Sequence, residues 1–571
     1  MTGGVTSRAR EATIATVRAA GRVPVLIIGA GINGAGLFRD LSLQGVDCLL
    51  VDRGDICAGA SAAPSRLIHG GIKYLETGEF RLVAQSTLER NLLLRNAPHY
   101  VRPLETVVPV QSWFGGIIPS LRRFLGLKAK LRDRGLLVTA LGLALYDWLG
   151  RNARSMPRHR LALRRASLRR FPAMNPAIVA TGTYYDARIT QPERLGLELV
   201  LDGLRENHSA HALNHVAVEG CADGAVMLHD RIGGARFAVV PRIVINAGGA
   251  WIDRINASLG IESHYIGGSK GSHLVVDSPP LLRALDGRMV YFGAADGRVC
   301  LAYPFMGHVL IGSTDIRADD PDAALCEPAE QDYMLSVMRE IFPAIALGAR
   351  DVLYRYCGVR PLPYSTSSDP GDISRDHSIR QDTLPGGGAV LSLIGGKWTT
   401  FRGFAEEVAD RVLTMLETPR RASTRTCAIG GGAGLPTDEA ARAAWMTRVA
   451  SAHGLDAARV AILLERYGST AESVAAWCAA GPDRALATLA DYSVREVERL
   501  CQEEMVETLA DLLFRRTDVA LSGRLTRAVA AETAAIAALA LGWSDARAGD
   551  ELNAVLTLAR QHGVQLDREA A

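Results

Sequence analysis

Residues 23–34 read Val-Pro-Val-Leu-Ile-Ile-Gly-Ala-Gly-Ile-Asn-Gly, and this stretch decides the fold. An apolar run ends directly in the pattern G-x-G-x-x-G, a helical pattern follows, and a second apolar run, residues 48–51, stops at Asp52. The first glycine of such a unit permits a tight turn, the second lets the backbone approach a pyrophosphate, and the third lets the helix pack on the strand. An acid about 20 residues further on accepts hydrogen bonds from ribose hydroxyls. The stretch therefore predicts a βαβ unit that binds a dinucleotide at the N-terminus of its helix.

Two more apolar runs end in glycines far down the chain. Residues 239–251 end in Asn-Ala-Gly-Gly-Ala-Trp, and residues 389–400 end in Gly-Gly-Lys-Trp-Thr-Thr. Each has the composition of a buried strand before a turn and a helix, where free backbone N–H groups bind anions. One such cluster alone is an ordinary turn. Three on one chain favour a ligand that is longer than the one bound by a nicotinamide half-site. Directly after the first unit, the small residues of loop 59–71 suit contact with a flat ring system.

The sequence resembles the FAD-dependent glycerol-3-phosphate dehydrogenases and α-glycerophosphate oxidases, within the glutathione reductase-like and D-amino-acid oxidase-like flavoproteins. The matching motifs follow the family order from about residue 20 to about residue 525. Besides the first glycine turn they are Ser65-Arg-Leu-Ile-His-Gly-Gly-Ile-Lys-Tyr-Leu-Glu, Glu79-Phe-Arg-Leu-Val, Lys270-Gly-Ser-His, Ile311-Gly-Ser-Thr-Asp, Cys357-Gly-Val-Arg-Pro-Leu and Gly395-Gly-Lys-Trp-Thr-Thr-Phe-Arg.

This resemblance implies an α/β fold with a discontinuous, Rossmann-like FAD-binding domain of the glutathione reductase or D-amino-acid oxidase type. The implied fold also includes an α+β substrate cap domain and an all-α C-terminal domain. The strands before the three glycine turns are spread over almost 400 residues, so a compact FAD domain must be discontinuous. The expected ranges are 1–20 for an N-terminal extension; 20–110, 175–275 and 355–415 for the FAD-binding domain; 110–175 and 275–355 for the cap domain, with a membrane-facing segment at 113–149; and 425–571 for the helical domain.

Several local patterns add detail to this division. Strand-like runs separated by glycines predict an antiparallel sheet over residues 289–313. Residues 430–436 have the composition of a flexible linker. Residues 493–516 show a 3.6-residue apolar period, and the Ala-rich stretch 528–540 has high helix propensity.

The resemblance implies one bound FAD. The residues expected to bind it are Gly29, Gly31, Asn33, Gly34, Asp52, Ser61, Ser65, His69, Gly70, Val216, Ala247, Gly248, Trp251, Gly396, Lys397, Trp398 and Thr399.

Oxidation of an alcohol needs a hydride acceptor, which a flavin supplies, and a base for the hydroxyl proton. His273 is the leading candidate for the base and His69 the second, since an unperturbed histidine titrates near neutral pH. A phosphorylated substrate also needs fixed cations. The catalytic candidates are therefore His273, Arg360, Lys397, His69 and Lys73, and the resemblance implies that Arg360 and Lys397 contact substrate.

The implied reaction is oxidation of sn-glycerol 3-phosphate to dihydroxyacetone phosphate, with electrons passed to quinone. Lys73 stands where the dehydrogenases usually have arginine, and a lysine offers a compact point charge in place of a planar fork. Another polyol phosphate, such as erythritol phosphate, is therefore an open alternative, as is an oxidase that uses dioxygen. A nicotinamide-dependent dehydrogenase and a non-catalytic flavin-binding protein are alternatives that the motifs favour less.

Composition sets the remaining expectations. The chain has 571 residues, which predicts two or three domains, and its net charge of +3 gives no indication of nucleic-acid binding. The nine cysteines include no C-x-x-C pair, which argues against a zinc site or disulfides and for a reducing compartment. Residues 1–21 lack an apolar signal core. We expect no metal, a cytoplasmic location on the inner face of the cytoplasmic membrane, and a homodimer as one form of assembly.

A membrane surface is expected from two adjacent segments. Residues 113–134 combine six basic residues with Trp, Phe and Leu, and residues 136–149 are almost wholly apolar. Basic charge beside aromatic residues is typical of a helix that lies on anionic lipid. A solvated basic face beside a core helix explains the same pattern equally well.

Overall fold

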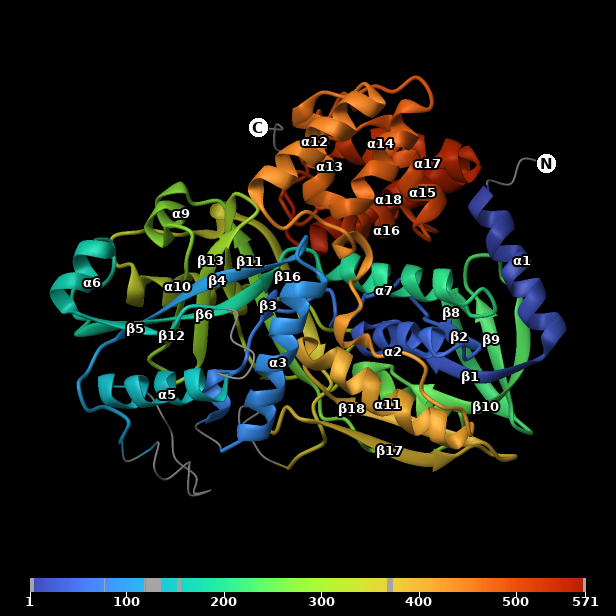
Figure 1. Ribbon diagram of the computed structural model, residues 1–571, viewed down its shortest axis with the longest axis horizontal. Coiled ribbons are helices and arrows are strands. Elements are labelled where there is room, and N and C mark those ends of the chain that lie inside the picture. The colour runs from blue at the N-terminus through green and yellow to red at the C-terminus, as the bar shows by residue number, and fades with distance from the viewer. Residues whose placement is uncertain are drawn as a thin grey trace.

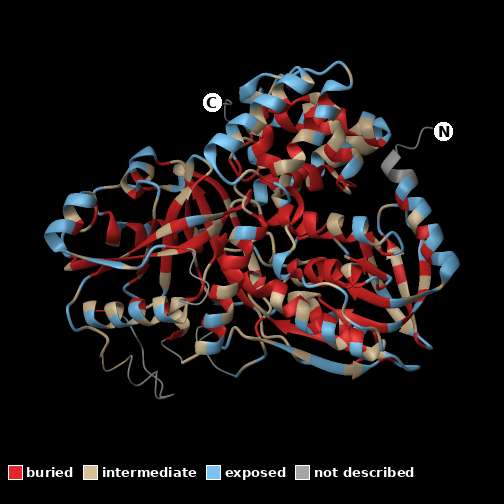
Figure 2. Cartoon of the chain, in the orientation of Figure 1, coloured by how far each residue is buried: buried red, intermediate tan, exposed pale blue. Residues whose placement is uncertain are grey.

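The computed structural model describes residues 5–75, 78–117, 119, 135–150, 156–366 and 373–567. Two β-sheets lie side by side, and the helical C-terminal region packs across their junction (Figure 1). Buried residues are concentrated inside both sheets and between the C-terminal helices (Figure 2). This confirms the predicted α/β class with an all-helical C-terminal region.

The first sheet contains the three strands that precede the glycine turns. Its order is β17-β18-β10-β1-β2-β7, and β1 pairs in parallel with both β2 and β10. Its central strands read as continuous apolar runs because helices cover the sheet. The strands are β1 (Arg22–Ile28), β2 (Cys48–Val51), β7 (His211–Leu213), β10 (Arg236–Asn246), β17 (His377–Thr383) and β18 (Ala389–Gly395), with β8 (Val216–Ala222) and β9 (Ala225–Asp230) attached through β10.

Helix α2 (Ile32–Leu43) begins directly after the first glycine turn and packs against α7 (Pro192–Glu206) and α11 (Phe401–Met415). A Cβ atom on Gly34 would lie 1.9 Å from the carbonyl oxygen of Gly29. The third glycine of the motif therefore lets α2 reach the turn, as the sequence predicts.

The second sheet is built mostly from antiparallel pairs and has the order β15-β11-β14-β13-β12-β4-β6-β3, with β16 and β5 attached. The predicted antiparallel sheet over residues 289–313 is confirmed, because β12, β13 and β14 pair in that way. The strands are β3 (Leu67–Ile68), β4 (Val101–Val110), β5 (Arg160–Leu163), β6 (Ala180–Ile189), β11 (Ser269–Val276), β12 (Met289–Gly293), β13 (Val299–Phe305), β14 (His308–Gly312), β15 (Ile316–Arg317) and β16 (Val352–Arg360).

Helices α3 (Phe80–Asn96), α5 (Leu136–Leu149), α6 (Arg164–Arg170), α9 (Pro279–Leu285) and α10 (Pro328–Ile341) surround this sheet. Strands β3, β4, β6 and β11 belong to it, although they lie, except for the end of β11, in the ranges predicted for the FAD-binding domain. The long β4–β6 ladder explains the difference, since it joins segments that are about 80 residues apart in the chain. The domain ranges themselves remain a prediction.

The C-terminal region consists of short helices. They are α12 (Glu439–His453), α13 (Ala457–Tyr467), α14 (Ala471–Ala479), α15 (Val494–Glu503), α16 (Leu509–Asp511), a π-helical turn (Leu512–Arg516), α17 (Arg527–Leu541) and α18 (Asp545–Gln561). The helix predicted over 528–540 is confirmed. The predicted linker is wrong at its start, because Gly430–Gly432 form a turn in which Gly430 and Gly431 are buried.

A buried charge network joins this region to the first sheet. Asp55, which follows β2, is 1% exposed and accepts hydrogen bonds from Arg516 at 2.6 and 2.8 Å and from Arg515 at 2.5 Å. Burial raises the pKa of the Asp55 carboxyl, but the guanidiniums of Arg516 and Arg515 together hold that pKa below its usual range. The N-terminal helix α1 (Val5–Ala20) joins the network through Arg10, whose Nη1 donates to Oδ1 of Asn214 at 3.2 Å, while Nδ2 of Asn214 donates to Oδ1 of Asp55 at 2.9 Å. The expected extension is therefore a packed helix.

Candidate active site

One cavity of about 1630 Å³ brings together the predicted site residues of both sheets. Eighteen of them line it, and Gly34 and Gly70 lie behind its wall. Those that line it are Gly29, Gly31, Asn33, Asp52, Ser61, Ser65, His69, Lys73, Val216, Ala247, Gly248, Trp251, His273, Arg360, Gly396, Lys397, Trp398 and Thr399.

The first glycine turn forms a narrow cradle at the carboxyl ends of the central strands of the first sheet. Gly29 has φ +107°, and a Cβ there would lie 2.6 Å from the carbonyl oxygen of Ala247 on the second turn. The turn is held by Asp52, whose carboxylate accepts from the N–H of Ala30 at 2.6 Å and of Gly54 at 2.8 Å. Glycine at these positions lets the backbone approach a ligand more closely than any side chain would allow.

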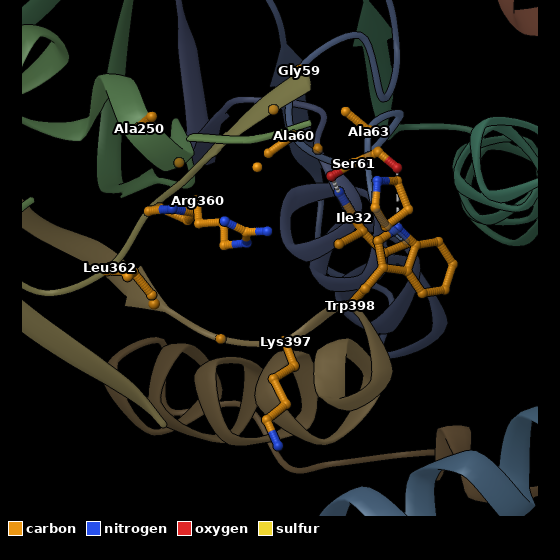
Figure 3. Close-up of a pocket in the computed structure, with 18 of the residues that line it drawn as sticks. Ile32, Gly59, Ala60, Ser61, Ala63, Ala250, Arg360, Leu362, Lys397 and Trp398 are labelled. Carbon is orange, nitrogen blue, oxygen red and sulfur yellow. Dashed lines mark hydrogen bonds between the residues drawn. The ribbon is translucent and has the colours of Figure 1, made fainter. Parts of the chain in front are cut away.

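Helix α2 presents its N-terminus to this cradle. Gly31 caps the helix without a side-chain hydrogen bond, and Oδ1 of Asn33 is buried with no partner among the described residues. Ser61 Oγ accepts from the N–H of Ile32 at 2.9 Å, and its carbonyl accepts from Nε1 of Trp398 at 3.2 Å (Figure 3). The first and third turns are therefore tied together around a helix N-terminus that favours phosphate. These residues fit the pyrophosphate of a dinucleotide.

Arg360 lies at the end of β16 and points into the cavity (Figure 3). Its Nη1 donates to Oδ1 of Asp315 at 3.1 Å, and Oδ2 of Asp315 lies 3.1 Å from Nη2 of Arg375. Gly271 makes room for the guanidinium, because a Cβ there would lie 1.9 Å from Nη2 of Arg360. Burial and the charge of Arg375 lower the pKa of Arg360 to about 10. Two guanidiniums that share one carboxylate leave a local excess of positive charge, which suits an anionic ligand.

Lys397 lines the same cavity from the third turn, and its side chain points away from Arg360 (Figure 3). Its Nζ donates to Ser86 Oγ at 3.2 Å and lies 3.7 Å from the centre of the Tyr74 ring. Burial lowers the pKa of Lys397 to about 7. Lys73 lines the cavity one residue before Tyr74, and its charge helps to lower the pKa of Asp315.

Both candidate histidines are neutral at pH 7. Burial lowers the pKa of His273 to about 3 and that of His69 to about 4, with further lowering by Arg360 at His273 and by Lys397 at His69. His273 Nε2 lies 2.7 Å from Ser65 Oγ, and its Nδ1 is buried with no partner among the described residues. A neutral imidazole can accept a proton, so both remain candidates for the base.

Some residues of the cavity were not predicted. Asp315 ends a motif that the sequence singles out, Ile311-Gly-Ser-Thr-Asp, but nothing in the motif signals a shared carboxylate. Arg375 and Asp186 have no motif that indicates a site. Asp322 also lines the cavity and accepts from Trp251 Nε1 at 2.9 Å and from Arg254 at 2.6 Å, which ties the loop before α10 to the second glycine turn.

The predicted membrane-facing segment is only partly described, because residue 118 and residues 120–134 lie outside the described ranges. Trp113, Phe114, Leu137, Leu141 and Trp148 are exposed, with Phe114 at 73% and Leu141 at 70%. Among the described residues, we find no helix with the length and apolar character needed to cross a bilayer.

Comparison with known proteins agrees with this geometry. Residues 24–411 match the FAD dependent oxidoreductase family, and residues 422–548 match the C-terminal domain of alpha-glycerophosphate oxidase. A glycerol-3-phosphate dehydrogenase of Synechocystis sp. is 34% identical over 524 residues, which cover 87% of this chain and 89% of the relative. An aerobic glycerol-3-phosphate dehydrogenase of Bacillus subtilis is 28% identical over 86% of each chain. The crystal structure of a glycerol-3-phosphate dehydrogenase from Bacillus halodurans in complex with FAD matches 99% of both chains, with a TM-score of 0.74 at 24% identity.

Proposed function

We infer that this chain, which belongs to the FAD-dependent oxidoreductase family and carries the C-terminal domain of alpha-glycerophosphate oxidase, oxidises sn-glycerol 3-phosphate to dihydroxyacetone phosphate. FAD, when bound, supplies the hydride acceptor. The glycine turns, the N-terminus of α2 and Asn33 fit its pyrophosphate.

One observation carries the choice of substrate class. The cavity that contains the glycine turns is also lined by the cations Arg360, Arg375 and Lys397, and the first two of these share the carboxylate of Asp315. Charge-assisted hydrogen bonds from arginine and lysine are the strong contacts to a phosphate. We assign Arg360 and Lys397 to the phosphate end or the reacting oxygen of the substrate, and a neutral imidazole, His273 first and His69 second, to the hydroxyl proton.

Anaerobic mixing of the holoenzyme with sn-glycerol 3-phosphate tests this function. We expect the flavin absorbance to bleach with this substrate and to stay unchanged with glycerol, which lacks the phosphate. Faster bleaching with erythritol 4-phosphate would assign the longer polyol phosphate, in agreement with Lys73 in place of arginine. No bleaching with any polyol phosphate would contradict the proposal.

Lys397 gives a pH dependence that can be measured. Because its pKa is about 7, it is mostly charged at pH 6 and mostly neutral at pH 8. If the substrate phosphate needs this cation, KM should rise about tenfold from pH 6 to pH 8, while kcat changes little. The phosphate itself gains negative charge near pH 6, which by itself would tighten binding, so the two effects have opposite signs. Steady-state assays across this range should show the rise in wild type and not in Lys397→Ala; a fall in KM in wild type would refute the role.

We further propose that the protein docks on the inner face of the cytoplasmic membrane and passes electrons to quinone. The exposed residues of α5, with Trp113 and Phe114, supply apolar contacts. A segment with exposed arginines lies next to α5. His159 belongs to this segment, and its Nδ1 lies 2.8 Å from Asp147 of α5. Those arginines are Arg158, Arg160, Arg164, Arg165, Arg169 and Arg170. Each basic residue near anionic lipid contributes about 1 kcal/mol, which salt weakens.

Flotation with anionic liposomes tests the docking. We expect the intact chain to float at low salt, and less so at high salt. A variant with Leu137, Leu141 and Trp148 changed to Ser should lose most of this binding, as should one with Arg122, Arg123, Lys128 and Lys130 changed to Ser. Leu539→Ser is the matched control, because Leu539 is 86% exposed on α17 of the C-terminal region. If the intact chain and all variants float equally, or if none of them floats, α5 is only a solvated face. An oxidase that uses dioxygen would then be the better interpretation.

A further inference from the structure

We propose that Tyr146 is a positioning residue for the reaction: with Asp186, it holds the amide of Gly70 and so fixes the His69–Gly71 turn in the wall of the cavity. This inference rests on the proposed function for its kinetic part. Tyr146 belongs to α5, which the sequence suggests only as an apolar segment near a membrane. Tyr146 is not among the residues assigned to the substrate, which are Arg360, Lys397, His273 and His69.

Tyr146 lies on the buried side of α5, while Leu137, Leu141 and Trp148 of the same helix are exposed. Its hydroxyl donates to Oδ1 of Asp186 at 2.7 Å. The same hydroxyl oxygen accepts from the N–H of Gly70 at 3.0 Å and from Nη1 of Arg90 at 2.9 Å. The phenol therefore uses its donor and accepts two hydrogen bonds, which defines its position.

Oδ1 of Asp186 receives three donors. Besides the Tyr146 hydroxyl, they are Nη1 of Arg90 at 2.9 Å and the N–H of Gly70 at 3.1 Å. Arg90 supplies the countercharge for this carboxylate, which is 1% exposed. A buried network of this kind is rigid when all of its members are paired. Since Asp186 also lines the cavity, the network stands directly behind the site.

The Gly70 position shows how closely the turn fits this network. A Cβ there would lie 2.2 Å from the hydroxyl oxygen of Tyr146 and 2.7 Å from Oγ1 of Thr87. This contact explains why a glycine that does not line the cavity belongs to the motif. Its two neighbours, His69 and Gly71, do line the cavity, and Gly71 has φ +77°.

The turn is also held from its other side. The N–H of His69 donates to Oγ1 of Thr399 at 3.3 Å, and a Cβ on Gly71 would lie 3.1 Å from Nζ of Lys397. A shift of Gly70 would therefore move both of its neighbours. One is His69, a candidate base, and the other is Gly71, which lies beside the candidate substrate cation Lys397. Displacements of about 1 Å near a reacting group cost up to about 100-fold in rate.

Tyr146→Phe tests the proposal, because it removes the hydroxyl and keeps the ring. Stopped-flow reduction of the FAD-loaded enzyme by sn-glycerol 3-phosphate should be about 10- to 100-fold slower at saturation, with the substrate dissociation constant unchanged within about twofold. The rate constant is measured per bound flavin, so a smaller folded fraction does not affect it. Tyr492→Phe is the matched control, since Tyr492 is also buried and its hydroxyl donates to Asp518 at 2.9 Å in the C-terminal region.

Hydrogen–deuterium exchange supplies a readout that needs no substrate. The peptide that contains Gly70 should exchange faster in Tyr146→Phe than in wild type, and no faster in Tyr492→Phe. Unchanged exchange and an unchanged reduction rate would overturn the proposal, as would a loss confined to substrate affinity. If wild type is not reduced by any polyol phosphate, the proposed function fails, and the exchange result alone decides whether Tyr146 positions the turn.

Discussion

Replacement of Arg360 by alanine is expected to lower kcat/KM roughly 30- to 1000-fold, which corresponds to about 2–4 kcal/mol of lost transition-state binding. The guanidinium points into the cavity and is only partly exposed, and Arg375 lies on the same carboxylate, that of Asp315. Its loss would also remove one of the two guanidiniums that contact Asp315, and Arg375 would be the one that stays. Lys397→Ala should fall in the same range for the same reason. Steady-state kinetics of FAD-loaded protein measures both effects.

Arg317→Ala is the matched control for Arg360. Both residues stand on strands that pair with β11 at the position of Ser269, but Arg317 is exposed and its Nη2 donates to the carbonyl oxygen of Ser365. It should retain near-normal kcat/KM. Arg360→Ala and Lys397→Ala proteins that keep FAD and a near-normal kcat/KM would disprove the substrate assignment.

Gly34→Ala is expected to abolish FAD retention and to lower the free energy of unfolding by about 3 kcal/mol or more. Its Cβ would meet the carbonyl oxygen of Gly29 at 1.9 Å and the carbonyl carbon at 3.0 Å, and both of these atoms belong to the backbone. No side chain can rotate to relieve this overlap, so α2 must move away from the turn. Purified protein should be colourless, and its thermal midpoint should fall.

Gly549→Ala is the control for this prediction. Gly549 lies inside α18, and a Cβ there has no neighbour within 4 Å. Alanine is the better helix former by about 1 kcal/mol, so this variant should be as stable as wild type or more stable, and yellow. A Gly34→Ala protein with a full complement of FAD would show that the contact between helix and turn is not required.

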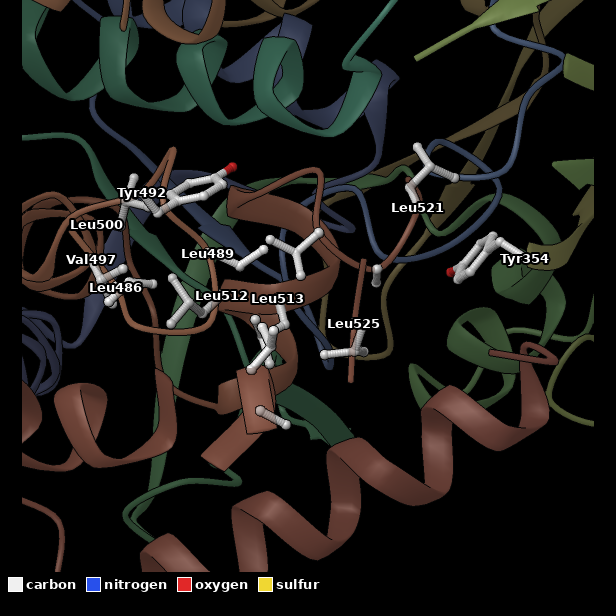
Figure 4. Close-up of a cluster of buried hydrophobic side chains, with 14 of the residues drawn as sticks. Tyr354, Leu486, Leu489, Tyr492, Val497, Leu500, Leu512, Leu513, Leu521 and Leu525 are labelled. Atoms are coloured by element: carbon white, nitrogen blue, oxygen red, sulfur yellow. The ribbon is translucent and has the colours of Figure 1, made fainter. Parts of the chain in front are cut away.

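The first sheet and its turns are largely predictable because each signal is local. The apolar run, the glycines and the acid at Asp52 appear in the chain in the order in which the structure uses them. The apolar period over residues 493–516 also identifies buried positions: Val497, Leu500 and Leu512 lie in one cluster (Figure 4). The break between α15 and α16 within that stretch is not visible from the period alone.

Long-range pairing sets the limit of prediction. Composition suggests a linker at residues 430–436, yet a Cβ on Gly431 would lie 1.9 Å from the carbonyl oxygen of Tyr467, so this glycine serves close contact. In the site, the turns and His273 can be found from motifs. The carboxylate shared by Arg360 and Arg375 depends on three segments that only the folded chain brings together.

The partners of Asp55 have a consequence for biosynthesis. Its guanidinium partners, Arg515 and Arg516, are 460 and 461 residues further along the chain. At a synthesis rate of roughly 5–20 residues per second, Asp55 waits on the order of 20 to 90 s for them after it leaves the ribosome. A nascent chain that stops before the C-terminal helices would have to bury this carboxylate without a countercharge, which is strongly unfavourable. The dinucleotide half therefore cannot reach its final packing until Arg515 and Arg516 have been made, and a chain released before them should be a substrate for chaperones or proteases.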